Sequence, residues 1–129
     1  QLRAAMSYPE DAVGALMDFE AVTVREDVTL EVVTRYLRRF DELPGHTDQI
    51  FVVDREEHLK GVLPITKIVV TDLDTLVGEA MEREFVALYP DDKAQDAAQA
   101  FERYDLVSAP VQDTRGRLVG RVTVDTVLD

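Results

Sequence analysis

The apolar and polar positions of the chain follow the same order of patterns twice. A short β-rich run comes first, an amphipathic helical stretch follows, two apolar strands joined by a polar turn come next, and a short helix ends the series. The first copy comprises 21–24, 29–40, 50–53, 59–63 and 66–70. The second copy comprises 85–88, 92–104, 106–111, 118–123 and 124–129. The pattern therefore predicts two β-α-β-β-α repeats, with a leading helix at about 9–17.

Matching residues indicate an internal duplication. Met17 and Met81 stand 64 residues apart, and the pattern Leu59-x-Gly61 returns 59 residues later as Leu118-x-Gly120. A loop at 43–48 in the first copy accounts for the difference. Two copies are typical of a pair of subdomains related by a pseudo-two-fold axis, because a solenoid needs three or more units. We therefore expect an α/β (α+β) fold of two similar halves.

The repeats also suggest domain boundaries and helix starts. We expect a leading linker helix at 1–17, a first domain at 18–75 and a second domain at 76–129. Short polar side chains favour the first position of a helix because they accept a hydrogen bond from its free N–H groups. Asp27 or Thr29 is expected to cap the helix of the first copy, and Asp91 or Asp92 that of the second.

The composition narrows the range of partners. The chain has 129 residues, 46% of them apolar, and a formal net charge of −12. This charge disfavours nucleic acid and anionic lipid, and it leaves solubility or the binding of divalent cations as its explanation. There is no cysteine, which excludes disulfides and thiolate metal sites. No apolar run reaches the length of a membrane span, so we expect this segment itself to be soluble.

Several segments resemble a known family. Leu59–Leu63 and Arg117–Thr123 resemble the closing segment of CBS (cystathionine-β-synthase-type) domains. Tyr8–Met17 resembles the linker helix that leads into the CBS pair of MgtE-type magnesium transporters, and Gly116–Asp129 resembles the segment that ends that pair. The chain thus resembles, over nearly its whole length, a tandem CBS-domain pair of an MgtE-type transporter.

The resemblance implies a regulatory role and not an enzymatic one. CBS pairs often form homodimers, and in the MgtE family the pair lies at the cytoplasmic face of the cell membrane. There it stands between an acidic amino-terminal domain and the transmembrane domain of the same chain, and bound Mg²⁺ favours the closed pore. We therefore expect this chain to be part of a longer membrane protein, to sense Mg²⁺ and to gate the pore.

The resemblance also implies which acids bind Mg²⁺. By position these are Asp105, after the long helix of the second copy, and Asp125 and Asp129 in the last helix. Thr126 stands where the family has a further Asp, which replaces a charged ligand with a neutral hydroxyl. Mg²⁺ keeps several waters and binds through one or two carboxylates, which suits a weak site. For Asp105 and Asp129 the alternative interpretation, a solvated surface acid, stays open.

Adenine nucleotides are the other ligands that the CBS resemblance brings into view. In the family motif a Ser or Thr contacts phosphate, and an Asp or Asn accepts the ribose hydroxyls. The first copy has Pro64 and Lys67 at these positions, and the second has Thr123 and Thr126. Because an unpaired buried polar group costs roughly 1–3 kcal/mol, we rank ATP and other adenine nucleotides well below Mg²⁺, with Thr123 as a weak candidate contact. A purely structural dimerisation module stays open as a third interpretation.

The remaining motifs add no further site. His46 and His58 lie in polar, turn-like segments and are expected to be surface side chains. The sequence contains no Gly-rich phosphate loop, no His-Glu-x-x-His motif and no nucleophile elbow. An enzyme is therefore the least supported interpretation.

Overall fold

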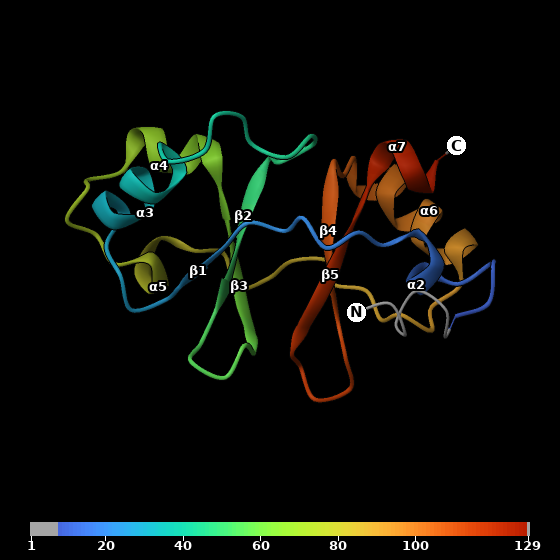
Figure 1. Cartoon of the computed structure of the whole chain (residues 1–129). Coiled ribbons are helices and arrows are strands. Elements are labelled where there is room, and N and C mark those ends of the chain that lie inside the picture. Colours follow the sequence, from blue (N-terminus) through green and yellow to red (C-terminus); the bar gives the residue numbers. More distant parts are fainter. Residues whose placement is uncertain (1–7, 129) are drawn as a thin grey trace. The chain divides into compact units, whose positions relative to one another are not determined.

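The computed structural model describes residues 8–128, which fall into two compact units. The first unit (residues 21–85) contains β1 (Thr23–Arg25), α3 (Leu30–Leu37), β2 (Gln49–Val53), β3 (Leu59–Pro64), α4 (Ile65–Val70) and α5 (Val77–Ala80) (Figure 1). The second unit (the described residues of 1–20 and 86–129) contains α2 (Val13–Leu16), α6 (Ala94–Tyr104), β4 (Ser108–Gln112), β5 (Leu118–Thr123) and α7 (Val124–Val127). Within residues 8–128, no helix is long and apolar enough to cross a membrane. The predicted α/β (α+β) class is confirmed.

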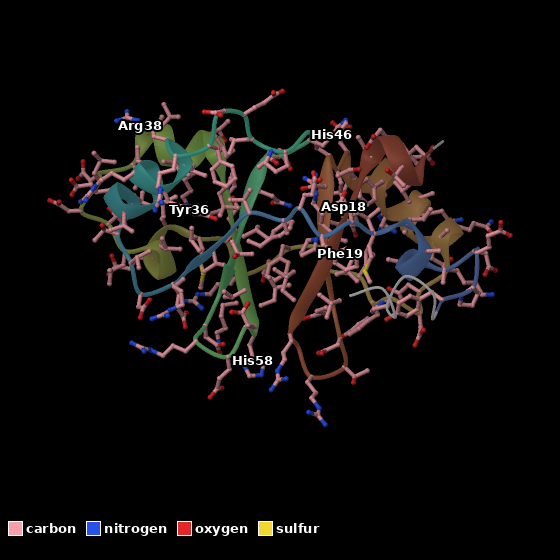
Figure 2. All side chains as sticks on the ribbon, in the orientation of Figure 1. Asp18, Phe19, Tyr36, Arg38, His46 and His58 are labelled. Carbon is pink, nitrogen blue, oxygen red and sulfur yellow. The ribbon has the colours of Figure 1, made fainter. Side chains whose placement is uncertain are left out.

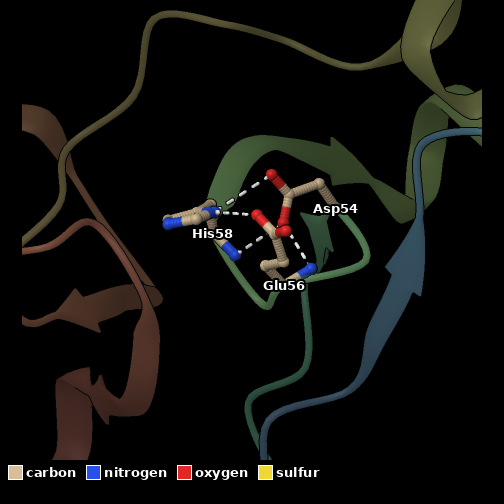
Figure 3. Close-up of side chains that lie close together, drawn as sticks. All are labelled: Asp54, Glu56 and His58. Carbon is tan, nitrogen blue, oxygen red and sulfur yellow. Dashed lines mark hydrogen bonds and ion pairs between the residues drawn. The ribbon is translucent and has the colours of Figure 1, made fainter.

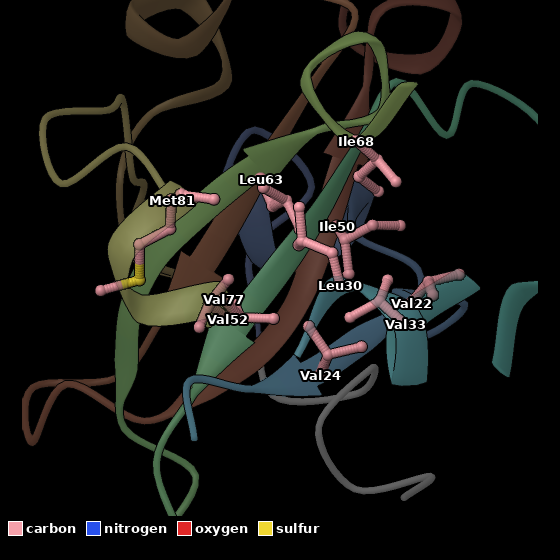
Figure 4. Packing of buried hydrophobic residues seen from close by; sticks show 11 residues of the cluster. Val22, Val24, Leu30, Val33, Ile50, Val52, Leu63, Ile68, Val77 and Met81 are labelled. Atoms are coloured by element: carbon pink, nitrogen blue, oxygen red, sulfur yellow. The ribbon is translucent and has the colours of Figure 1, made fainter. Parts of the chain in front are cut away.

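The first unit is built on a three-stranded sheet. β1 pairs in parallel with β2, and β2 pairs antiparallel with β3. All of β2 after Gln49 is buried, as is typical of a central strand covered on both faces. Ile50 and Val52 of this strand belong to an apolar cluster with Leu30 and Val33 of α3 (Figure 4). The periodic apolar positions of the predicted helix are therefore the ones that reach the sheet.

The second unit has a smaller sheet than its repeat predicts. β4 and β5 form an antiparallel pair, over which Phe101 of α6 is buried with Val111 and Val122. The strand predicted at 85–88 is wrong, because this segment makes only an isolated parallel bridge between Leu88 and Val111.

Pro110 gives the physical reason for the missing strand. In the first unit the backbone N–H of Phe51 donates to the carbonyl of Val22 at 3.0 Å. Pro110 occupies the position equivalent to Phe51, and proline has no N–H to donate toward Val86. The bonds on either side of Leu88 persist at 2.9 Å, so one bridge remains where the first unit has a strand.

A four-residue helix precedes each repeat and bonds to the other repeat. The N–H of Val13 in α2 donates to the carbonyl of Asp92 at 2.8 Å, and the N–H of Val77 in α5 donates to that of Val28 at 2.8 Å. The helix predicted at 9–17 is thus shorter in the structure, and α5 was not predicted. Both helices are too short for an amphipathic period to show in the sequence.

The two long helices begin differently. Thr29 caps α3, as predicted, by accepting a hydrogen bond from the N–H of Val32 at 3.4 Å. The prediction that Asp91 or Asp92 caps α6 is wrong: Lys93 occupies the capping position and makes no side-chain cap. Asp92 instead accepts a hydrogen bond from the N–H of Tyr89 at 2.9 Å, which holds the turn before the helix.

Gly61 and Gly120 stand where the segment after each short helix crosses the last strand of a unit. A Cβ added at Gly61 would lie 2.7 Å from the carbonyl oxygen of Glu82, and one at Gly120 would lie 2.9 Å from that of Asp18. At each crossing the residue after the glycine exchanges two backbone hydrogen bonds with the crossing segment: Val62 with Glu82, and Arg121 with Asp18. Glycine is therefore required by close backbone approach, for the same reason in both repeats.

Candidate functional site

Asp105 occupies a special backbone position at the end of α6. It adopts the left-handed conformation, with φ 55° and ψ 48°, and its N–H donates to the carbonyl of Phe101. Gly is usual there because it has no Cβ, and Asn and Asp are the other residues that adopt this conformation most readily. The carboxylate is exposed, and within residues 8–128 no side-chain hydrogen bond or ion pair engages it. An uncommitted acid thus lies at the negative end of the α6 dipole, where cations are favoured.

Asp125 and Thr123 form a compact polar group at the start of α7. The Thr123 hydroxyl donates to the Asp125 carboxylate at 2.5 Å and lies 3.3 Å from the hydroxyl of Thr126. Thr123 is buried and Asp125 is exposed. The buried hydroxyl therefore orients the exposed carboxylate, and it already has a partner before any nucleotide is considered.

The structure places two of the three predicted metal ligands, Asp105 and Asp125, on neighbouring elements of one unit. α6 and α7 contact each other, so Asp105 and Asp125 both lie at ends of packed helices. Asp129 lies outside the described residues. Among residues 8–128, neither acid belongs to a cluster of three or more possible metal-binding side chains. The metal assignment of Asp105, Asp125 and Asp129 stays a prediction.

A different cluster forms at the turn between β2 and β3. Asp54, Glu56 and His58 each bring a ligand atom within 4.8 Å of the others (Figure 3). The His58 Nδ1 lies 3.1 Å from Asp54 Oδ2 and 3.8 Å from Glu56 Oε1. Partial desolvation opposes the charge of Asp54, but hydrogen bonds from the backbone N–H groups of His58 and Glu56 and from the His58 ring outweigh it, so the pKa of Asp54 is lowered.

The alternating spacing Asp-x-Glu-x-His was the signal that the sequence carried for this cluster. The two histidines differ in their surroundings: His58 lies at the β2–β3 turn, whereas His46 precedes β2 in a loop (Figure 2). His58 lies at the surface, as the sequence predicts, but its side chain is 34% exposed and lies beside two acids. The two histidines are far apart in the sequence and predict no shared site, whereas the partners of His58 are the acids two and four residues before it.

The equivalent turn of the second unit shows what the fold itself needs. Asp113 Oδ1 accepts hydrogen bonds from the N–H groups of Arg115 and Arg117 at 2.9 and 3.0 Å. Partial desolvation opposes the charge of Asp113, but these bonds and the two nearby guanidinium groups lower its pKa. Gly116 takes the left-handed position in this turn, with φ 83°. The anchoring Asp is thus common to both turns, while the acid and the imidazole belong to the first alone.

Comparison with known proteins gives consistent matches. The chain is 42% identical over 129 residues to the magnesium transporter MgtE of Thermus thermophilus, of which it covers 29%, and 29% identical to that of Enterococcus faecalis, of which it covers 28%. It therefore spans less than a third of these relatives. The crystal structure of the cytosolic domain of the Mg²⁺ channel MgtE in complex with ATP matches with a TM-score of 0.92 and 42% identity, over 99% of this chain and 52% of that one. The predicted resemblance to the MgtE-type CBS pair is confirmed.

The low rank given to adenine nucleotides is wrong. It rested on Pro64, Lys67 and Thr126, which depart from the nucleotide motif of CBS domains. The related cytosolic domain, at 42% identity, has been solved with ATP bound. The departures at Pro64, Lys67 and Thr126 are therefore not a sufficient reason to rank adenine nucleotides below Mg²⁺.

The family assignment rests on both halves of the chain. Residues 13–74 match the CBS domain family, and so do residues 77–129. The two matches coincide with the duplicated strand and helix order of the structure. The chain belongs to the CBS domain family and carries two copies of the domain in tandem.

Proposed function

We propose that the chain is the Mg²⁺-sensing regulatory module of a magnesium transporter and that it is not itself an enzyme. The observation that carries the proposal is the 42% identity, over the whole chain, to a magnesium transporter. In this proposal the module lies at the cytoplasmic face of the membrane. An amino-terminal domain precedes it and the transmembrane pore follows it in the same protein.

The carboxylates of the second unit suit a weak Mg²⁺ site. Asp105 offers an uncommitted carboxylate at the C-terminal end of α6, and Asp125 lies on the contacting helix α7. Mg²⁺ is a hard cation that takes one or two carboxylates and keeps its remaining waters. A site of this kind binds at roughly millimolar levels and so responds to changes in cellular Mg²⁺. Asp129 completes the proposed set.

The high negative charge would let a cation bound at such a site change how closely acidic domains approach each other. Acidic surfaces repel each other, and a cation between them favours their approach. Binding and closure are then linked, because the ion binds the closed arrangement more tightly than the open one. With a net charge of −12, this module would resist closure against another acidic domain until Mg²⁺ is present.

A homodimer is part of the proposal. α4 exposes Val69 and Val70, whose relative exposures are 79% and 81%. Adjacent apolar side chains this open to water are typical of an interaction surface. A second copy of the chain is the partner that we propose for this face of the first unit.

A Mg²⁺ titration followed by amide NMR tests the site. The proposal predicts that amide signals around Asp105 and Asp125 shift between zero and about 10 mM Mg²⁺, with millimolar affinity. Asp105→Asn, which keeps the shape and removes the charge, should weaken the response. Asp96→Asn, an equally exposed acid in the first turn of α6, is the matched control. Unchanged spectra at saturating Mg²⁺ would refute the proposal.

Adenine-nucleotide binding is a second candidate function, favoured by the ATP complex of the related cytosolic domain. Thr123 at the start of α7 is the residue with which we propose to locate it. An ATP titration monitored by thermal shift should raise the melting temperature of the wild type, and Thr123→Val should reduce the rise. If neither ATP nor Mg²⁺ has any effect while the chain still forms dimers, a structural dimerisation module is the remaining interpretation.

A further inference from the structure

The β2–β3 turn holds three side chains of the kinds that bind transition metals. Asp54 Oδ2, Glu56 Oε1 and His58 Nδ1 face one another at the tip of the hairpin (Figure 3). Asp54 uses its other oxygen, Oδ1, to accept hydrogen bonds from the N–H groups of Glu56 and His58 at 2.9 Å each. The backbone of the turn thus fixes one carboxylate and leaves its second oxygen directed at the imidazole.

The turn does not need the other two side chains in order to fold. In the second unit, Asp113 anchors the same backbone turn with Arg115 in place of Glu56 and Arg117 in place of His58. The repeat thus provides an internal control, in which one hairpin carries an imidazole and two acids and the other carries guanidinium groups. Glu56 and His58 are therefore additions to the structural turn.

The distances suit a single ion. Zn²⁺ binds nitrogen and oxygen ligands at about 2.0–2.2 Å, which places neighbouring ligand atoms about 3.0–3.6 Å apart. The His58 Nδ1 already lies 3.1 Å from one carboxylate oxygen and 3.8 Å from the other. Glu56 Oε1 lies within 4.8 Å of the other two ligand atoms, and because this side chain is 76% exposed it can rotate toward an ion while water completes the coordination.

The charges around the turn also favour a cation. The shallow pocket beside it is lined by the acids Glu26, Asp27, Asp54 and Glu56 and by Arg25 and Arg55. Both arginines are directed to one acid: Arg25 pairs with Asp27 at 2.8 Å, and Arg55 lies 3.7 Å from the same carboxylate. The guanidinium groups therefore neutralise Asp27 and leave the acids near His58 for another cation.

We propose that Asp54, Glu56 and His58 form a binding site for a divalent transition metal ion such as Zn²⁺. The ion would bind between His58 Nδ1 and the two carboxylate oxygens that face it, and one nitrogen with two oxygens is a ligand set for Zn²⁺ and related divalent transition metals. Mg²⁺ prefers oxygen ligands alone, so this site is chemically distinct from the proposed Mg²⁺ site in the second unit. The chain would then respond to two classes of metal ion through different units.

Zinc titration of the whole chain, by calorimetry and by NMR of the histidine rings, tests the proposal. One Zn²⁺ is expected to bind per chain with roughly micromolar affinity and to shift the His58 ring signals, in the presence of excess Mg²⁺. His58→Arg, which copies the second turn, should weaken binding at least about tenfold. His46→Asn should leave it unchanged.

A second variant guards against an indirect effect. Glu56→Gln keeps the size of the side chain, leaves the anchoring Asp54 intact and should also weaken Zn²⁺ binding. Melting temperatures without metal show that each variant is folded. The proposal is overturned if Zn²⁺ binds equally to wild type, His58→Arg and Glu56→Gln, if His46→Asn abolishes binding, or if wild type shows no binding below about 1 mM.

Discussion

At the scale of single residues, Asp105 combines a left-handed backbone with a carboxylate that is available to bind a cation. Asp105 holds a left-handed position in which glycine would be less crowded, and its carboxylate has no protein partner within residues 8–128. A carboxylate that is less favourable than glycine for the local backbone, and that makes no contact of its own, is a candidate for function. In contrast, the Asp113 carboxylate accepts hydrogen bonds from two backbone N–H groups, so its role in holding the turn accounts for its presence.

Replacing Asp105 with glycine should separate stability from binding. Glycine adopts the left-handed conformation without crowding, so Asp105→Gly should stabilise the chain by about 0.5–1 kcal/mol in the absence of Mg²⁺. The same change should weaken Mg²⁺ binding, because it removes the carboxylate. Chemical denaturation with and without Mg²⁺ measures both effects. A variant that is more stable and still binds Mg²⁺ as the wild type does would remove Asp105 from the site.

Asp113 predicts a specific dependence of stability on pH. Its pKa is lower in the folded chain than the usual 3.8, so its stabilising effect is present above that value and is lost as pH falls through the lowered pKa. Asp113→Ala should cost about 1 kcal/mol at pH 7, since hydrogen bonds of the turn are lost. The difference in melting temperature between variant and wild type should shrink below about pH 4. A difference that is constant down to pH 2 would contradict this account.

At the scale of elements, the sequence predicts correctly those helices and strands whose apolar residues recur with a regular period. It does not predict changes caused by a single residue or by a single helical turn. The apolar spacing of 29–40 and the paired strands with their turns predicted α3, β2 and β3 well, because burial imposes a period on each. The sequence failed at the first strand of the second repeat, where Pro110 removes one backbone donor. It also failed at α5, since a single helical turn has no period to detect.

For the candidate sites too, the sequence indicates some of the residues, but only the structure shows their geometry and their contacts. Asp105 and Asp125 were reached through resemblance to a family, whereas their backbone geometry and partners required coordinates. Asp54, Glu56 and His58 lie within five consecutive residues and would share one face of an extended chain, but there Asp54 and His58 would be about 13 Å apart. The turn brings their ligand atoms within 4.8 Å of one another, and the pattern of residue types alone does not predict the geometry of the turn.

The close crossing at the last strand of each unit should be sensitive to one methyl group. Gly61→Ala and Gly120→Ala each place a Cβ against a backbone carbonyl, which should destabilise the chain by about 1–3 kcal/mol. Gly45→Ala is the matched control, because a Cβ there meets no atom within 4 Å. Urea denaturation of the three variants checks this. Equal stability for all three would mean that the crossings are looser than described.

At the scale of the whole molecule, charge and exposed apolar surface act together. The net charge of −12 opposes the association of two chains, so apolar contacts or cations must offset it. Val69 and Val70 supply such contacts in the proposed homodimer. If the proposed homodimer forms, its assembly would be held near balance, and a bound cation could shift it.

Charges placed on α4 should dissociate the proposed dimer. The double change Val69→Asp and Val70→Asp replaces apolar contacts with like charges facing each other across the interface, so the chain should sediment as a monomer. Gln95→Asp with Gln99→Asp adds the same two charges on α6 and should leave the dimer intact. Sedimentation velocity distinguishes these outcomes. A dimer that survives the α4 changes would place the interface elsewhere.

The most direct test of the central claim is the melting temperature of the chain as a function of Mg²⁺ concentration. Mg²⁺ at about ten times its dissociation constant should add roughly 1.4 kcal/mol of stability, which corresponds to a rise of about 3–6 °C. The rise should be strongly reduced in a variant that carries both Asp105→Asn and Asp125→Asn. A melting temperature that does not change with Mg²⁺, or that rises equally in the variant, would contradict the account.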